Sequence, residues 1–192
     1  MLPDFKENTL PPYLGFPTTS ALMSPFWATM QEFVVRFGNT LERIKILEGL
    51  LDYRARLRSY GITGFQWLSG SFVENVEVIR NRPPGDVDVV SIIYRPAGYE
   101  SDGEWNAFAV GEVDELLFKA DLMKKTYQCD AYTIDMNDPA FEVVDLTRFW
   151  FGLFTHQKVT DNWKGIVVVE LDEQQDTEAR TILSQAAASL AI

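Results

Sequence analysis

Residues 86–94 read DVDVVSIIY, so two aspartates open a run of β-branched and other apolar residues. A composition of this kind predicts a β-strand. Because side chains along a strand alternate between its two faces, Asp86 and Asp88 project on the same side. Two carboxylates this close together repel each other, and a divalent cation removes the repulsion. The segment therefore predicts a strand that carries a carboxylate site.

A third acidic residue would complete such a site. Magnesium prefers oxygen ligands, commonly one or two carboxylates together with the phosphates of a substrate. Asp130 is the first choice, since it lies within the strand predicted over residues 128–134, and Asp135 at the end of that strand is the second. The alternative for Asp130 is an edge strand or a pairing with an arginine. Zinc sites built from several cysteines are excluded, because the sequence holds one cysteine, Cys129, and one histidine, His156.

Gly70 and Ser71 follow a short strand predicted over residues 65–68. Glycine lets the backbone approach a ligand closely, and serine adds a hydroxyl and an N–H group. If a helix begins here, its N-terminus is a seat for phosphate. The alternative is an ordinary turn. Three basic residues are candidates for contact with a triphosphate, namely Arg80, Arg82 and Lys164.

The order of these residues resembles the signature of the polymerase-beta-like nucleotidyltransferase superfamily. That signature consists of Gly-Ser, a variable stretch, Asp-x-Asp and a further acidic residue on a later strand, which correspond here to Gly70-Ser71, Asp86-Val87-Asp88 and Asp130. The run WLSGSFV, residues 67–73, is similar to the small bacterial branch found in toxin–antitoxin and defence loci. The resemblance covers roughly residues 41–135. Fourteen residues separate Ser71 from Asp86, slightly more than is usual, and we expect residues 76–83 to form a protruding hairpin or loop.

This resemblance implies an α+β fold in which helices flank a mixed β-sheet. It also implies Mg²⁺-dependent transfer of a nucleoside monophosphate from a nucleoside triphosphate, with ATP as the first choice, to a hydroxyl acceptor. The site residues that it implies are Asp86, Asp88 and Asp130 as catalytic residues and metal ligands, and Gly70, Ser71, Arg80, Arg82 and Lys164 around the nucleotide. The alternative is a catalytically silent module of the same fold that binds a nucleotide or a partner protein. Base preference, the acceptor, the oligomeric state and the retention of catalysis stay open at this point.

Five prolines in residues 3–25 exclude a long helix and a central strand from that segment. We expect an extended arm that packs on the body or on a partner, followed by a first helix over residues 25–37. The arm and this helix make up residues 1–39, and a nucleotidyltransferase-like domain spans residues 40–192. Within that domain the sequence predicts helices over 41–59, 112–125, 144–155 and 175–190, a strand over 165–171 and a loop over 96–111. The aromatic helix 144–155 is expected to be buried.

The formal charge is distributed unevenly along the chain. Residues 1–96 carry ten basic and ten acidic side chains, whereas residues 97–192 carry the whole net charge of −11. A strongly acidic surface repels long polyanions, so duplex nucleic acid is not an expected partner. A hydroxyl group on a partner protein is favoured as the acceptor, and tRNA stays open. Because no apolar run is long enough to span a bilayer and no secretory signal is seen, we expect a cytoplasmic protein outside the membrane.

Overall fold

A computed structural model describes residues 2–158 and 160–191. Its centre is a five-stranded sheet with the strand order β1-β5-β2-β3-β4. The strands are β1 (Phe26–Trp27), β2 (Thr63–Ser69), β3 (Val87–Tyr94), β4 (Cys129–Asp135) and β5 (Val167–Glu170). β2 is antiparallel to both β3 and β5, whereas β3 pairs with β4 and β1 pairs with β5 in parallel. The predicted α+β class, with a mixed sheet between helices, is confirmed.

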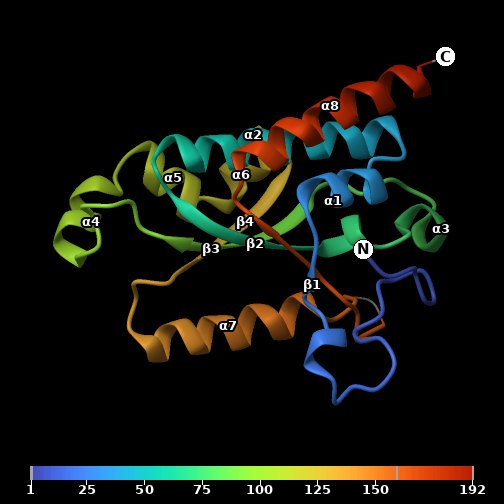
Figure 1. The fold of residues 1–192 in the computed structure, drawn as a ribbon, viewed down its shortest axis with the longest axis horizontal. Helices are drawn as coiled ribbons and strands as arrows, with labels where there is room; N and C mark the ends of the chain where they lie inside the picture. Colours follow the sequence, from blue (N-terminus) through green and yellow to red (C-terminus); the bar gives the residue numbers. More distant parts are fainter. Residues whose placement is uncertain (1, 159, 192) are drawn as a thin grey trace.

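Helices cover the two faces of the sheet unequally (Figure 1). One face carries α1 (Met30–Phe37), α2 (Leu41–Ser59), α5 (Glu112–Phe118), α6 (Ala120–Tyr127) and α8 (Glu173–Leu190). Of the described helices, only α7 (Ala140–Phe154) covers the other face. The short helices α3 (Val76–Arg80) and α4 (Asp102–Phe108) lie at opposite ends of the sheet. Two 3-10 helices, η1 (Ser20–Leu22) and η2 (Gly70–Val73), complete the set.

Strand β3 contributes to the hydrophobic core on both sides of the sheet. Val89 lies in the larger core together with Leu50 of α2, and Val90 lies in the smaller core together with Phe154 of α7. Since neighbouring residues of a strand face opposite sides, β3 buries both of its faces, which explains its nearly continuous apolar sequence. The strand is therefore a rigid support for the aspartates at its start.

The proline-rich arm packs on the body, which was one of its two expected positions. Leu10 is fully buried in the larger core. The helix expected from residue 25 begins instead at Met30, because β1 comes first and pairs with β5 at the edge of the sheet. Thr29 and Glu32 form a capping box at the start of this helix. The expected boundary between residues 39 and 40 stays a prediction.

Three predicted elements are wrong in their bounds or type. The expected loop over residues 96–111 contains helix α4. The expected helix over residues 112–125 is divided at Lys119 into α5 and α6. The expected hairpin or loop at residues 76–83 begins with helix α3. In each case a short helix brings apolar side chains to the interior, and the buried ones include Val76, Trp105 and Leu117.

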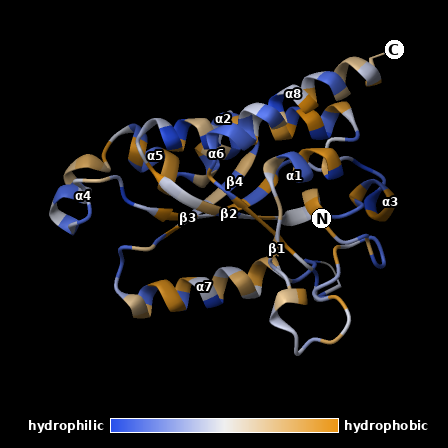
Figure 2. Cartoon of the chain, in the orientation of Figure 1, coloured by the Kyte–Doolittle hydropathy of each residue, from blue (hydrophilic) through white to orange (hydrophobic). Residues whose placement is uncertain are grey.

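Helix α7 was expected to be buried, but most of it is not. It begins at Ala140 rather than at residue 144, and Phe154 is its buried residue, whereas Phe141 is 81% exposed. Because no other described helix shares this face of the sheet, the side of α7 that is turned away from the sheet faces solvent. Figure 2 shows hydrophobic residues along the length of α7. Among the described helices, none combines the length and the hydropathy that crossing a membrane requires.

Candidate functional site

The three predicted carboxylates gather at the edge of the sheet where β3 and β4 begin. The two strands run parallel, and their register pairs Asp88 with Asp130. Asp86 directly precedes β3, and all three aspartates line the same cavity. The carboxylates converge because parallel strands start at a common edge, and the alternation of side chains keeps Asp86 and Asp88 on one side.

The cavity has a volume of about 570 Å³, which lies in the range of small-ligand sites. Its polar wall includes the turn at Gly70 and Ser71 besides the three aspartates. Glu74 and Asp161 add two further carboxylates, and the basic side chains of the lining are Arg80, Lys124, Lys158 and Lys164, with His156 beside them. Tyr132, Leu153 and Phe154 form a less polar wall. The cavity therefore offers carboxylates and cations within one space, as a metal–phosphate ligand requires.

The turn at Gly70 lies directly against the Asp88 carboxylate. Gly70 has φ +78°, a left-handed conformation that favours glycine. A Cβ atom at this position would lie 2.6 Å from Oδ2 of Asp88, closer than real side chains approach. Ser69, the preceding residue, is the antiparallel register partner of Asp88. Glycine is thus required here both by the backbone conformation and by the contact with the aspartate.

The carboxylates are only partly neutralised by the protein. Burial, followed by the charges of Asp86 and Asp130, raises the pKa of Asp88 to about 6. The ammonium group of Lys124 lies 2.5 Å from Oδ2 of Asp86 and 3.6 Å from Oδ2 of Asp130. The hydrogen bond to Asp86 raises the pKa of Lys124. Burial, followed by a hydrogen bond with Asp130, raises the pKa of Tyr132 to about 12.

The chemistry of this donor set fits a hard divalent cation. Magnesium takes carboxylate oxygens, and it would stabilise the charged form of a partly buried carboxyl such as Asp88, whose pKa is raised by burial and by its acidic neighbours. In the described part of the chain, however, no three Asp, Glu, His or Cys side chains already surround one point as metal ligands. Lys124 stands between Asp86 and Asp130 instead. Its side chain is 50% exposed, so it can move aside for a cation.

Asp135, the second choice for the third carboxylate, lies at the far end of β4. Its Oδ2 accepts a hydrogen bond of 2.6 Å from Nε of the buried Arg95. Arg95 also donates to Asp102 and Asp138. Asp130 is therefore the residue that β4 brings to the cavity, and Asp135 belongs to an ion cluster elsewhere.

The structure separates the three residues that were expected to contact a triphosphate. Arg80 lines the cavity. Arg82 is exposed and donates a hydrogen bond of 2.9 Å to the carbonyl of Pro83, and it is not among the residues that line the cavity. Lys164 lines the cavity but is almost fully buried, and its ammonium donates to the Gly70 carbonyl at 2.8 Å and to Glu74 at 2.7 Å.

Sequence reasoning missed several residues of this cavity. Tyr132 could have been found from strand alternation, since it lies two residues after Asp130 on the same face of β4. Lys124 and Lys158 gave no sequence signal, because their positions depend on how α6 and the segment after α7 pack. His156, the one histidine of the chain, is exposed and lines the cavity. Its Nδ1 lies 2.6 Å from the Gly152 carbonyl, so Nδ1 carries a proton that it donates.

A family model matches residues 3–170, a span that contains every residue lining the cavity. The chain belongs to DUF6932, a family of unknown function. Comparisons with curated proteins and with solved structures gave no match. The resemblance to nucleotidyltransferases therefore rests on the sequence motifs alone, namely Gly70-Ser71, Asp86-Val87-Asp88 and Asp130.

Proposed function

We propose that this chain has a polymerase-beta-like nucleotidyltransferase fold. We further propose that it moves a nucleoside monophosphate, in a Mg²⁺-dependent reaction, from a nucleoside triphosphate to a hydroxyl acceptor. The observation that carries the proposal is the packing of Gly70 against Asp88 in a cavity that Asp86 and Asp130 also line. This packing joins a backbone turn that phosphates can approach to a group of carboxylates that lacks a full complement of positive charge. Both parts are needed to hold a metal–triphosphate ligand.

In this proposal the three aspartates would hold Mg²⁺, and the turn at Gly70 and Ser71 would receive the terminal phosphates. Bound Mg²⁺ would supply stabilisation of the attacking and leaving oxygens. The acceptor oxygen forms a bond to the α-phosphorus, the bond from that phosphorus to the β-phosphate oxygen breaks, and pyrophosphate leaves. The acceptor's proton passes to Asp130, whose side chain is 27% exposed against 18% for Asp86. An acceptor approaching from solvent therefore reaches Asp130 more readily.

ATP is the proposed donor, and a hydroxyl group of a partner protein in the cytoplasm is the proposed acceptor. The charge distribution supports a protein acceptor, because the acidic second half of the chain repels long nucleic acids. A role in a toxin–antitoxin or defence system follows from the resemblance of residues 67–73 to the small bacterial branch. Modification of tRNA is the other acceptor to test.

A second candidate is a catalytically silent module that binds a nucleotide or a partner protein. The position of Lys124 favours it, because this ammonium already neutralises part of the charge that a cation would neutralise. If Lys124 does not leave, the chain can still bind phosphate groups at the turn without turning them over.

Triphosphate-dependent release of pyrophosphate separates the two candidates. The protein is incubated with Mg²⁺, each nucleoside triphosphate labelled at the α-phosphate, and cell extract, and both pyrophosphate and transferred label are measured. An enzyme releases pyrophosphate and loses this activity in Asp86→Asn. A silent module gains thermal stability from the triphosphate, about 2.7 kcal/mol at a hundredfold excess over Kd, but releases no pyrophosphate. Neither release nor stabilisation with any triphosphate would refute both the enzyme and the nucleotide-binding module, and it would leave only a module that binds a partner protein.

A further inference from the structure

We infer that Lys164 and Glu74 form a buried ion pair that positions the phosphate-binding turn, so that Lys164 acts on the nucleotide through the backbone of Gly70 and Ser71. This inference rests on the proposed function, and it assigns a role to Lys164 other than direct contact with a triphosphate. It follows from three sets of contacts around residues 70–74.

The first set is the ion pair itself. The Lys164 ammonium donates to the carbonyl of Gly70 at 2.8 Å and to Oε1 of Glu74 at 2.7 Å. The two side chains are 4% and 2% exposed. The second carboxylate oxygen of Glu74 accepts a hydrogen bond of 3.0 Å from the side chain of Gln157. Two of the three donors on Lys164 are thus engaged inside the protein.

The contact between Lys164 and the Gly70 carbonyl also determines the orientation of the next N–H group, because the peptide bond is planar and trans. The carbonyl of one residue and the N–H of the next lie in one plane and point in opposite directions. Because the Gly70 carbonyl is drawn toward Lys164, the Ser71 N–H points away from Lys164. Ser71 lines the cavity. Fixing the Gly70 carbonyl therefore also fixes the direction of the Ser71 N–H, which is the backbone donor that we propose a phosphate uses.

A second buried cation holds the same turn from another direction. Arg43 of α2 donates to the carbonyl of Phe72 at 2.7 Å and to the carbonyl of Glu74 at 2.8 Å, and Glu77 pairs with its Nε at 2.6 Å. Arg43 is only 3% exposed. The carbonyls of Gly70, Phe72 and Glu74 are therefore fixed by two cations that have little access to solvent.

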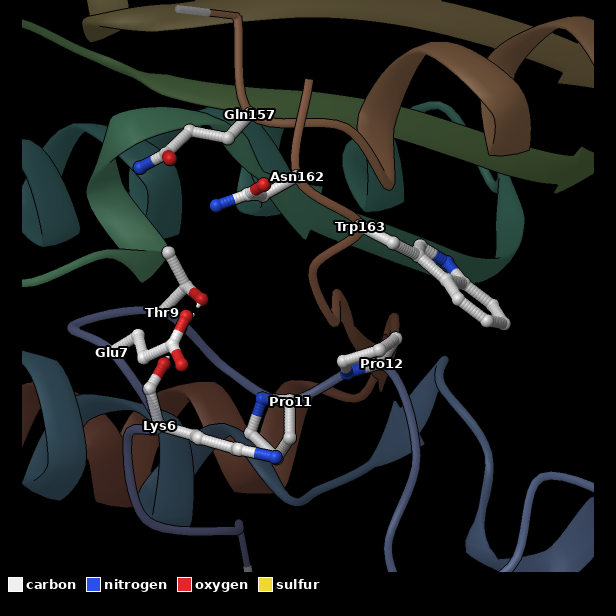
Figure 3. Close-up of a pocket in the computed structure, with 8 residues that line it drawn as sticks. All are labelled: Lys6, Glu7, Thr9, Pro11, Pro12, Gln157, Asn162 and Trp163. Carbon is white, nitrogen blue, oxygen red and sulfur yellow. Dashed lines mark hydrogen bonds between the residues drawn. The ribbon is translucent and has the colours of Figure 1, made fainter. Parts of the chain in front are cut away.

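The third set connects the turn to the segment that follows α7 and to the arm. The Ser69 hydroxyl donates to the Phe154 carbonyl at 2.9 Å. The Asn75 N–H donates to the Asn8 carbonyl at 2.9 Å. Gln157, which holds Glu74, also lines a smaller cavity of about 240 Å³, where it faces residues of the arm (Figure 3). Segments that are far from the turn in sequence therefore hold it in place by hydrogen bonds.

The test separates positioning from plain stability by comparing Lys164→Met with the double variant Glu74→Gln/Lys164→Met. The single variant leaves a buried carboxylate unpaired and is expected to lose stability, whereas the double variant removes both charges and regains it. Inorganic triphosphate with Mg²⁺ is the probe. We expect the double variant to bind it at least tenfold more weakly than the wild type, with faster hydrogen exchange at the amides of Ser71 and Phe72.

Two further variants keep the test decisive. Lys164→Arg retains the charge but changes the reach to Gly70, so it should fold and still show weaker binding and faster exchange at Ser71. Lys158→Met removes a positive charge from the cavity wall without touching the turn, and it should leave the exchange at Ser71 unchanged.

The outcomes that overturn the inference are distinct from those that overturn the proposed function. If the stable double variant binds triphosphate as the wild type does, the ion pair has only a structural role and the proposed function stands. If binding weakens while the Ser71 amide exchanges as in the wild type, Lys164 is a direct contact. If the wild type itself neither binds triphosphate nor releases pyrophosphate, the proposed function fails and the inference fails with it.

Discussion

The two ends of the β3–β4 pair carry similar numbers of acidic side chains but compensate them very differently. At the end where the strands finish, the buried Arg95 contacts Asp135 at 2.6 Å, Asp102 at 2.9 Å and Asp138 at 3.2 Å. At the end where they begin, three aspartates meet the half-exposed Lys124.

We interpret the Arg95 end as a structural ion cluster and the Lys124 end as the candidate ligand-binding site. The buried Arg95 guanidinium donates hydrogen bonds to three carboxylates and so ties β3, β4 and the start of α4 together. At the opposite end the cation, Lys124, is half-exposed, the aspartates line a cavity, and burial together with the charges of Asp86 and Asp130 raises the pKa of Asp88. Perturbed groups of this kind cluster at functional sites. Four predictions test the comparison, from the largest effect to the smallest.

The largest effect is expected for transfer activity in Asp88→Asn. This change removes a ligand oxygen's charge from the proposed cation site, and several kcal/mol of transition-state stabilisation corresponds to a loss of roughly 1000-fold or more. Pyrophosphate release is the measurement. Asp135→Asn is the matched control from the other end of β4, and it should retain activity at 25 °C. Equal losses in the two variants would erase the distinction between the ends.

The free energy of unfolding should be more sensitive to substitutions at the Arg95 end of β3 and β4. Asp135→Asn takes one charged partner from the buried Arg95, and we expect a loss of about 2–3 kcal/mol in the free energy of unfolding, a value for a charged hydrogen bond in a partly compensated cluster. Urea denaturation measures it. A change below about 0.5 kcal/mol would mean that Asp102 and Asp138 hold Arg95 without Asp135.

Gly70→Ala should cost about 2 kcal/mol of stability and most of the activity. The left-handed backbone penalises a side chain, and the new Cβ would displace the Asp88 carboxylate. Gly85→Ala is the matched control, because a Cβ at Gly85 meets nothing within 4 Å. Comparable effects of the two substitutions on unfolding would show that the Gly70 turn is not packed against Asp88.

The pH dependence of stability gives a smaller but signed effect. The folded protein holds the Asp88 proton more tightly than the unfolded chain, because the pKa rises from 3.8 to about 6 on folding. This carboxyl therefore lowers stability as the pH rises from about 4 to above 6. Asp88→Asn stays neutral, and we expect it to be about 1–2 kcal/mol more stable than the wild type near pH 7.5, less than the full shift because Asp88 is partly exposed. Near pH 4 the two proteins should unfold alike, and a variant less stable than the wild type near pH 7.5 would contradict the account.

The sequence was informative where the local pattern determines the structure. Alternation along residues 86–94 was enough to place Asp86 and Asp88 on one side of a strand. Thr40, a residue type that favours helix N-caps, caps α2 by accepting a hydrogen bond of 3.2 Å from the Arg43 N–H. The glycine at position 70 was expected to allow close approach, although the group it approaches is Asp88.

Features that depend on packing between distant segments could not be predicted. The sequence ranked Asp130 above Asp135, but which of the two reaches the cavity is decided by the direction and register of β4 beside β3. The burial of Lys164 depends on Glu74, which is remote in sequence. The exposure of α7 depends on how many helices share its face of the sheet, a property that periodicity does not report.

The most direct measurement of the central claim is paramagnetic broadening by Mn²⁺ in the presence of a non-hydrolysable nucleoside triphosphate. The account predicts that amide signals near Gly70, Ser71, Asp88 and Asp130 broaden first, while those near Asp135 and Arg95 stay sharp. Broadening centred on the Arg95 end of β3, or no broadening at saturating Mn²⁺ and nucleotide, would contradict it.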